Sequence, residues 1–149
     1  MRAVIQRVSR ARVTVGGSVT GEIGTGLLVL LGVCDQDTTA DAEYLVKKTL
    51  SLRVFEDESG KMNLPLGDVE GGVLVVSQFT LCGDVRRGNR PSFDKAASPE
   101  QACQLYEHFV ACIRARGFRC ETGQFQEMMD VELVNAGPVT ILLDSQKVF

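Results

Sequence analysis

Two predominantly apolar runs constrain the fold of this chain more than any other feature. The first is Gly26-Leu27-Leu28-Val29-Leu30-Leu31-Gly32-Val33, and the second is Val73-Leu74-Val75-Val76-Ser77-Gln78-Phe79-Thr80-Leu81, which begins with aliphatic residues only. A short run without polar alternation is typical of a strand that is covered on both faces. We therefore expect residues 26–33 and 73–81 to form central strands of a sheet.

Weaker strand signals surround these two runs. Arg12-Val13-Thr14-Val15 and Ser18-Val19-Thr20 alternate on either side of Gly16-Gly17. This pattern predicts a hairpin with a two-residue turn. Further strands are expected at residues 52–55, 62–64, 128–134 and 139–143.

A first helix is expected from about Thr39 to Leu50. Thr38 has the residue type of an N-cap, and Asp41 falls in the first turn, where the helix dipole favours an acidic side chain. Apolar positions recur at intervals of three and four residues, which predicts one buried stripe. The stripe consists of Ala42, Leu45, Val46, Thr49 and Leu50.

A second helix is expected between Pro99 and Gly117. Ser98 is a favourable N-cap, proline suits the first helical position, and Gln101 completes a capping box. Its apolar stripe consists of Ala102, Leu105, Phe109, Cys112 and Ile113. Two main helices beside many strands indicate an α+β fold, with a single domain over residues 1–149 and a largely antiparallel or mixed sheet.

Charge and hydropathy exclude several classes of function. Sixteen Lys and Arg face 19 Asp and Glu, so the net charge is −3 and no global basic field favours wrapping long nucleic acids. Gripping one end of an RNA is still compatible with this charge. No apolar run approaches the roughly 20 residues that a membrane span needs, and the N-terminus does not resemble a signal peptide. We expect a cytoplasmic protein without a membrane partner.

Cysteine and histidine usage gives no sign of a metal site or a cofactor. The chain has one histidine, His108, so a histidine-rich metal centre is impossible, and nothing local marks that residue as catalytic. No two cysteines have the Cys-x-x-Cys spacing, and we expect reduced thiols that serve in packing. The five cysteines are Cys34, Cys82, Cys103, Cys112 and Cys120.

Two short segments are candidates for chemistry. Ser77-Gln78-Phe79-Thr80 ends an apolar strand with hydrogen-bonding side chains, which fits either a strand emerging into a loop or a site whose backbone N–H groups hold an oxyanion. Gly137-Pro138 interrupts an apolar segment, and this pair fits either a plain turn or a rigid pair of backbone acceptors. The basic stretch of residues 86–93 is either a solvated loop or a phosphate contact.

Taken together, the motifs resemble those of the D-aminoacyl-tRNA deacylase family. Ser77-Gln78-Phe79-Thr80-Leu81 and Asn135-Ala136-Gly137-Pro138-Val139-Thr140 are similar to the two signature motifs of that family. The likeness covers essentially the whole chain in family order. Its other segments are residues 5–8, 21–24, 26–33, 60–64 and 90–93.

The resemblance implies the fold of that family and a homodimer with its sites at the subunit interface. Its members hydrolyse the ester joining a D-amino acid to the 3′-terminal adenosine of tRNA, and they remove glycine from mischarged alanine tRNA. It implies catalytic roles for Ser77, Gln78, Phe79 and Thr80, with water as the attacking group and the adenosine 2′-hydroxyl assisting. It further implies a cis Gly137-Pro138 peptide that excludes L-aminoacyl groups, with Arg7 holding that filter, and no cofactor or metal.

The chain departs from the family pattern in two places. Ala136 stands where the family usually has Asp before Gly-Pro, which removes a carboxylate that could brace the filter. Gln126 and Glu127 are bulkier than the small residues usual after the phenylalanine. By resemblance, Phe125 and Met129 belong to the substrate or adenosine pocket.

Two other hypotheses compete with the deacylase. One is a different small-ester or amide hydrolase, in which Thr80 or Ser77 is a covalent nucleophile. The other is a non-enzymatic binding module in which Gly137-Pro138 is only a turn. The sequence does not specify the preferred amino acids, the preferred tRNAs or the order of water and 2′-hydroxyl participation.

Overall fold

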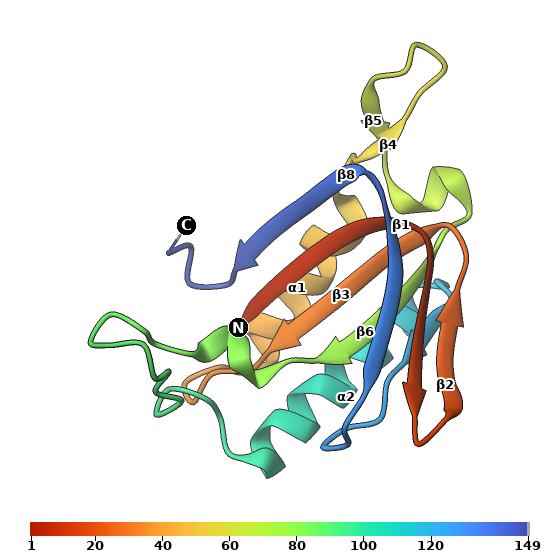
Figure 1. Ribbon diagram of the computed structural model, residues 1–149. Coiled ribbons are helices and arrows are strands. Elements are labelled where there is room, and N and C mark those ends of the chain that lie inside the picture. The colour runs from red at the N-terminus through yellow and green to blue at the C-terminus, as the bar shows by residue number, and fades with distance from the viewer. Residues whose placement is uncertain (149) are drawn as a thin grey trace.

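The computed structural model describes residues 1–148, and its elements follow one another as an α+β chain (Figure 1). The first half contains β1 (Arg2–Val15), β2 (Ser18–Ile23), β3 (Gly26–Gly32), α1 (Thr39–Ser51), β4 (Phe55–Glu56) and β5 (Met62–Leu64). The second half contains β6 (Gly72–Ser77), α2 (Pro99–Ala115), β7 (Cys120–Thr122) and β8 (Asp130–Asp144). Two short 3-10 turns complete the order, η1 (Leu66–Val69) and η2 (Phe79–Cys82).

The main sheet is mixed, as expected. Strand β1 pairs in the antiparallel sense with β2, β3 and β8, whereas β3, β6 and β7 pair in parallel. The strand order is β2-β1-β3-β6-β7, and β8 lies against β1 at the edge of the sheet. Strands β4 and β5 form a separate small antiparallel pair. The fold class predicted from the sequence is therefore confirmed.

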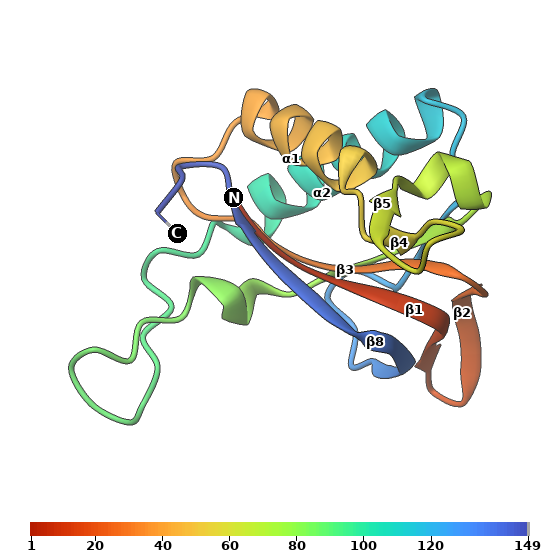
Figure 2. The same ribbon diagram turned by 90° about the horizontal axis from the view of Figure 1, so that it is seen from above.

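Both helices cover the same face of the sheet (Figure 2). Their buried side chains form the main core with alternate residues of the strands, including Ile5, Val29 and Val75. A second cluster lies on the opposite face, where Leu28, Leu74 and their neighbours pack against the curled end of the sheet. Apart from the partly exposed Leu30, residues 26–33 are thus buried from both sides, which explains their uninterrupted apolar character.

The hairpin and α1 agree with the sequence in detail. Gly16 and Gly17 have φ angles of +54° and +83°, a left-handed geometry that the two-residue turn requires and that glycine adopts readily. In α1 the carboxylate of Asp41 accepts a hydrogen bond of 2.9 Å from the Thr38 N–H. The buried residues of α1 are the predicted stripe: Ala42, Leu45, Val46, Thr49 and Leu50.

Helix α2 differs from its prediction at two points. Ser98 Oγ accepts the Gln101 N–H at 3.3 Å, so Ser98 is the N-cap. The Gln101 side chain does not complete a capping box, because its amide donates instead to the carbonyls of Asp35 and Asp37. Tyr106 and Val110 are buried in place of Ala102 and Cys112, which are only partly covered.

The strand predictions need correction at several points. The strand expected at residues 52–55 is wrong in its bounds, because only Phe55 and Glu56 pair with β5. Strand β1 begins at Arg2, well before the predicted Arg12.

The second apolar strand ends at Ser77, because the backbone turns at Gln78 and continues as η2. The two expected C-terminal strands are one element, β8, which runs through Gly137-Pro138 with an irregular register against β1. The three-residue strand β7 was not predicted. Within residues 1–148, no helix is both long and apolar enough to cross a bilayer.

Candidate active site

Hydrogen bonds to its backbone groups hold the turn η2 at the end of β3. The Gln78 N–H donates to the Leu31 carbonyl at 2.8 Å, and Arg2 Nη1 donates to the Leu81 carbonyl at 2.8 Å. A Cβ on Gly32 would lie 2.9 Å from the Leu81 Cβ and 3.0 Å from the Gln78 carbonyl oxygen. Glycine at position 32 therefore lets η2 approach the strand closely.

Backbone N–H groups at the start of η2 are available to a ligand. The first N–H groups of a helical turn have no partner inside the turn, and here these belong to Phe79 and Thr80, both of them exposed. The following groups are used internally, since the N–H of Leu81 donates to the Gln78 carbonyl at 3.2 Å. The N–H of Gly83 donates to the Thr80 carbonyl at 3.0 Å. This arrangement suits a developing negative charge on oxygen.

The side chains of this motif offer no base that could activate a nucleophile. The Gln78 amide donates a short hydrogen bond to Thr80 Oγ1. His108 lies on α2, where its Nε2 is 3.1 Å from Glu43 Oε1 on α1, and it does not line the cavity beside η2. An amide cannot accept a proton from the Thr80 hydroxyl at neutral pH, so the geometry favours positioning over covalent attack.

A cavity of about 580 Å³ opens beside the end of β6. Residues 77–79 and residues 125–129 both line it. The start of α2 and the segment before it also contribute, which the sequence did not indicate. Their contributing residues are Ala96, Ala97, Pro99 and Ala102.

The structure places both expected pocket residues, Phe125 and Met129, in the lining of this cavity. The Phe125 ring packs on the ring of Tyr106, with centroids 5.8 Å apart, and Tyr106 donates its hydroxyl proton to the Val75 carbonyl at 2.9 Å. A Cβ on Gly123 would lie 2.6 Å from Met129 Sδ, so the methionine is packed closely against that backbone.

Gln126 and Glu127, the two bulky departures from the family pattern, also line this cavity. Gln126 has a φ of +64°, a left-handed geometry that turns the chain directly after Phe125. The carboxylate of Glu127 brings a negative charge to the lining of this cavity. The shape and charge of the pocket therefore depend on these two side chains.

The Gly137-Pro138 peptide is cis, as the resemblance implied. It lies beside a different cavity of about 390 Å³, which is lined by Arg7, Phe55, Glu56 and Gly137 among others. Arg7 Nε donates to the Ala136 carbonyl at 2.8 Å, and Nη1 donates to the Val54 carbonyl at 2.6 Å.

Asn135 braces this segment, a role that the sequence analysis missed. Its Oδ1 accepts the Val139 N–H at 2.9 Å, and its Nδ2 donates to Thr140 Oγ1 at 3.1 Å. These two bonds tie the residues on either side of Gly137-Pro138 together. An asparagine just before a turn commonly bonds nearby backbone, which was the available signal.

A single chain does not bring the two signature motifs together. Arg7, which contacts the segment of Gly137-Pro138, pairs with Leu27 of β3, and Leu27 pairs with Val73 at the start of β6. Ser77 lies at the other end of β6. Four residues of strand separate Val73 from Ser77, which corresponds to about 13 Å. Each motif also lines its own cavity.

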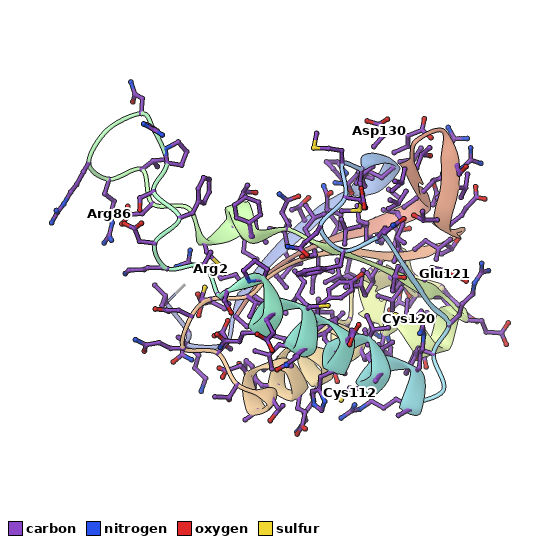
Figure 3. All side chains as sticks on the ribbon, turned by 90° about the horizontal axis from the view of Figure 1, so that it is seen from below. Arg2, Arg86, Cys112, Cys120, Glu121 and Asp130 are labelled. Carbon is purple, nitrogen blue, oxygen red and sulfur yellow. The ribbon has the colours of Figure 1, made fainter. Side chains whose placement is uncertain are left out.

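The basic stretch forms a loop that projects away from the sheet (Figure 3). Arg86, labelled there, is bound by Asp84, and its guanidinium holds the pKa of that carboxyl far below its usual range. Arg87 and Arg90 are exposed. Phe93 at the end of the loop contacts Phe79 edge-on, with ring centroids 5.0 Å apart, and so connects the loop to η2.

One cluster has the residue types of a metal site, although it lies apart from η2. The ligand atoms of Glu43, His108 and Cys112 are within 4.8 Å of one another on the facing sides of α1 and α2. None of the three lines either cavity described above. This cluster therefore has no part in the chemistry at residues 77–80.

Comparison with known proteins identifies the family. A family model described as D-Tyr-tRNA(Tyr) deacylase matches residues 4–144. The D-aminoacyl-tRNA deacylase of Koribacter versatilis (strain Ellin345) is 67% identical, and the alignment covers 100% of both chains. The D-aminoacyl-tRNA deacylase of Symbiobacterium thermophilum is 64% identical, covering 100% of this chain and 99% of the relative.

Solved structures share the fold. One described as c-Myc DNA unwinding element binding protein matches with a TM-score of 0.91 and 46% identity, covering 97% of this chain and 98% of its own. A probable eukaryotic D-amino acid tRNA deacylase shares the fold, with a TM-score of 0.81 at 19% identity over 95% of this chain and 97% of its own. The enzyme class expected from the motifs is confirmed, and the chain belongs to the D-Tyr-tRNA(Tyr) deacylase family.

Proposed function

We propose that this protein hydrolyses the ester bond of D-aminoacyl-tRNA and releases the D-amino acid and the tRNA. Relatives at 64–67% identity over the full length bear the name of this activity. The observation that carries the proposal is η2, which presents the free N–H groups of Phe79 and Thr80 at the mouth of a cavity. The same site accepts glycine from mischarged alanine tRNA, since glycine has no side chain to exclude. The cytoplasm, where tRNA is charged, is the proposed location.

The N–H groups of Phe79 and Thr80 stabilise the oxyanion that forms when the ester carbonyl is attacked. Two preorganised donors of this kind contribute several kcal/mol, about 3 kcal/mol for each donor removed in comparable enzymes. Water is the nucleophile and the adenosine 2′-hydroxyl assists it, because the Thr80 hydroxyl accepts a hydrogen bond from the Gln78 amide, which is not a base. Ser77 and Gln78 position the substrate.

The terminal adenosine occupies the cavity between residues 77–79 and residues 125–129. Phe125 and Met129 supply apolar surface for the base, and the cavity volume of about 580 Å³ falls in the ordinary range for a small-molecule site. Exposed arginines of the projecting loop, Arg87 and Arg90, contact phosphates of the acceptor end. This local charge compensates for the overall negative charge of −3.

We propose that the active protein is a homodimer in which Gly137-Pro138 of one protomer reaches the partner's η2. In one chain the two motifs lie at opposite ends of the strands, so a site that uses both needs two chains. The helices leave one face of the sheet open (Figure 2). An apolar row of side chains crosses that face. Leu142, Val4 and Leu30 are in register along this row, and Leu142 is 56% exposed. A second copy covers this row.

The backbone carbonyls of Gly137 and Pro138 then exclude an L-side chain. Selectivity of this kind acts by rejection, because a D-aminoacyl group or glycine leaves the filter untouched while an L-side chain clashes with it. Arg7 holds the filter through the Ala136 carbonyl, and Asn135 braces it from the other side. These bonds take the place of the carboxylate that Ala136 lacks.

A paired deacylation assay tests the proposal. D-Tyr-tRNA and L-Tyr-tRNA are incubated separately with the protein, without added metal, and the remaining ester is measured over time. Rapid loss of the D-ester alone is expected. Loss of both esters would contradict the chiral filter and point first to Ala136.

Adduct trapping and an assay with Gly-tRNA test the two competing hypotheses. A covalent acyl adduct on Thr80 or Ser77, trapped by acid quench and mass spectrometry, would replace water attack with the nucleophile mechanism. Loss of no ester, with Gly-tRNA as well as D-Tyr-tRNA, would favour the binding module.

A further inference from the structure

Cys34 and Cys82 lie against each other directly behind η2. Their Sγ atoms are 2.9 Å apart, although the residues are 48 positions apart in the sequence. A disulfide bond has a sulfur–sulfur distance of about 2.05 Å, so the two thiols need to approach by less than about 1 Å to form one.

The backbone holds both cysteines in place. Cys34 pairs with Ala96 across an isolated bridge, and its N–H donates to Asp37 Oδ2 at 2.6 Å. Cys82 is the buried last residue of η2, and its thiol lies 3.4 Å from the Val33 carbonyl. These contacts hold the backbone of Cys34 and the thiol of Cys82 in place, and with the two Sγ atoms 2.9 Å apart the pair is preorganised for bond formation.

The two thiols differ in reactivity. The hydrogen bond from Cys82 lowers the pKa of Cys34, with help from the positive charges of the N-terminal amine and Arg2, against the opposing effects of burial and Asp37. The pKa of Cys82 is raised, first by the hydrogen bond that it donates and then by burial. Cys34 is partly exposed and Cys82 is buried. Cys34 thus has the character of an attacking thiolate, and Cys82 that of a second thiol that resolves the product.

We propose that Cys34 and Cys82 form a reversible disulfide that inactivates the enzyme when peroxide is present. The Cys34 thiolate attacks hydrogen peroxide, the O–O bond breaks, and Cys34 becomes a sulfenic acid while the leaving hydroxide takes up one proton from solvent and departs as water. The Cys82 sulfur then attacks that sulfur, the S–O bond breaks, and a second water leaves with the Cys82 proton. The two sulfurs lose two electrons, which reduce the peroxide. A dithiol reductant reverses the reaction.

The disulfide acts on the site through η2. Cys82 ends the turn that begins with Phe79 and Thr80, and the next residue, Gly83, donates its N–H to the Thr80 carbonyl. Drawing the Cys82 sulfur toward Cys34 therefore displaces the N–H groups that hold the oxyanion. A misplacement of about 1 Å can reduce a rate by on the order of a hundredfold. This step rests on the proposed function of η2.

Peptide mapping tests the bond itself and does not depend on the proposed function. The reduced protein is treated with a small excess of hydrogen peroxide, the remaining thiols are blocked, and the digest is analysed without reductant. A peptide that joins Cys34 to Cys82, lighter by two hydrogens, is expected before any oxidation of Cys103. Cys103 is a matched control, because it is partly exposed but hydrogen bonds to Glu107 instead of another cysteine. Oxidation of Cys103 first, or a stable sulfenic acid on Cys34 without a cross-link, would overturn the proposal.

Activity and stability complete the test. The cross-linked protein should deacylate D-Tyr-tRNA at least about tenfold more slowly, recover with dithiothreitol, and melt at a temperature higher by on the order of 10 °C. The Cys34→Ser variant should keep its activity in peroxide, and the Cys103→Ser variant should behave like the wild type. A cross-linked protein with an unchanged rate would overturn the switch. If the reduced protein hydrolyses no aminoacyl-tRNA, the proposed function fails, while the peptide map and melting temperature still decide the disulfide.

Discussion

The guanidinium of Arg7 joins segments that are far apart in the sequence, since it donates from β1 to the carbonyls of Val54 and Ala136. We expect Arg7→Lys to destabilise the protein by about 1–3 kcal/mol, because one ammonium cannot span both acceptors and a buried carbonyl loses its partner. L-Tyr-tRNA hydrolysis should rise in the same variant. Urea unfolding and the paired assay measure the two effects.

Arg12→Lys is the matched control for that substitution. Arg12 bonds Glu22 on the exposed side of the same strand, so its replacement should change neither stability nor chirality control. Equal effects at Arg7 and Arg12 would contradict the bracing role of Arg7.

Single-residue roles could be predicted only where a motif carried them. Ser77-Gln78-Phe79-Thr80 and Gly137-Pro138 stood out locally, and the structure places each beside a cavity. The contact between Cys34 and Cys82 could not be predicted, because tertiary packing brings together residues that are 48 positions apart in the sequence. The cluster of Glu43, His108 and Cys112 could not be predicted for the same reason, since Glu43 lies on another helix.

At the scale of elements, the contact between η2 and β3 depends on Gly32. We expect Gly32→Ala to lower kcat/KM for D-Tyr-tRNA by at least about tenfold and to destabilise the protein by about 1–3 kcal/mol. The physical reason is that the new Cβ would lie 2.9 Å from Leu81 and push the turn off the strand. Steady-state kinetics and urea unfolding measure the change.

Gly24→Ala supplies the control for this substitution. A Cβ at Gly24 would meet nothing within 4 Å, so activity and stability should stay close to those of the wild type. A loss at position 32 no larger than the change at position 24 would show that the close approach of η2 to β3 is unimportant.

Strand β7 predicts a pH dependence of stability. Burial raises the pKa of Cys120 to about 11, above the usual 9.0 of a free thiol. The unfolded chain therefore loses this proton first as the pH rises, and the free energy of unfolding falls between about pH 9 and about pH 11. Burial raises the pKa of Tyr106 as well, so Cys120→Ala should flatten this decline without abolishing it. Urea unfolding across this pH range measures it, and an unchanged slope in the variant would refute the assignment.

Periodicity explains which elements were predictable. The stripe of α1 matched residue for residue because thirteen residues give a helical repeat several turns to show itself. Strand β7 has three residues, which are too few to show a recognisable alternation of apolar and polar side chains. Residues 78–81 were assigned to a strand because their composition suits one, whereas the close contact with Gly32 makes them turn.

At the scale of the whole molecule, mixed dimers can show whether the site uses two chains. Subunits of a Gln78→Ala/Thr80→Ala variant, with impaired chemistry, are exchanged with subunits of a Gly137→Ala variant. The latter should lose its filter, because Gly137 has a φ of +134° and the added Cβ would lie 2.7 Å from Arg7 Nη2. If the filter acts in the partner's site, each mixed dimer contains one site with both motifs intact.

The expected result is that mixing lowers L-Tyr-tRNA hydrolysis per Gly137→Ala subunit and restores selective hydrolysis of the D-ester. If both motifs belonged to one chain, the Gly137→Ala subunit would keep hydrolysing the L-ester in the mixed dimer. Hydrolysis of L-Tyr-tRNA per Gly137→Ala subunit therefore falls in the first case and stays unchanged in the second. The sequence could not supply this arrangement by itself, since the distance between the motifs depends on the strand order.

The long ladder between β1 and β8 also has a consequence for how the chain is made. Arg2 contacts Asp144 across 142 positions of sequence, so β1 pairs with a strand that is synthesised much later. Pairings of such separation form late and slowly, because the loop between them must close first. Until β8 has been made, β1 presents an unpaired edge that is open to other chains. The interval between synthesis of β1 and synthesis of β8 is therefore where a chaperone has the most to protect.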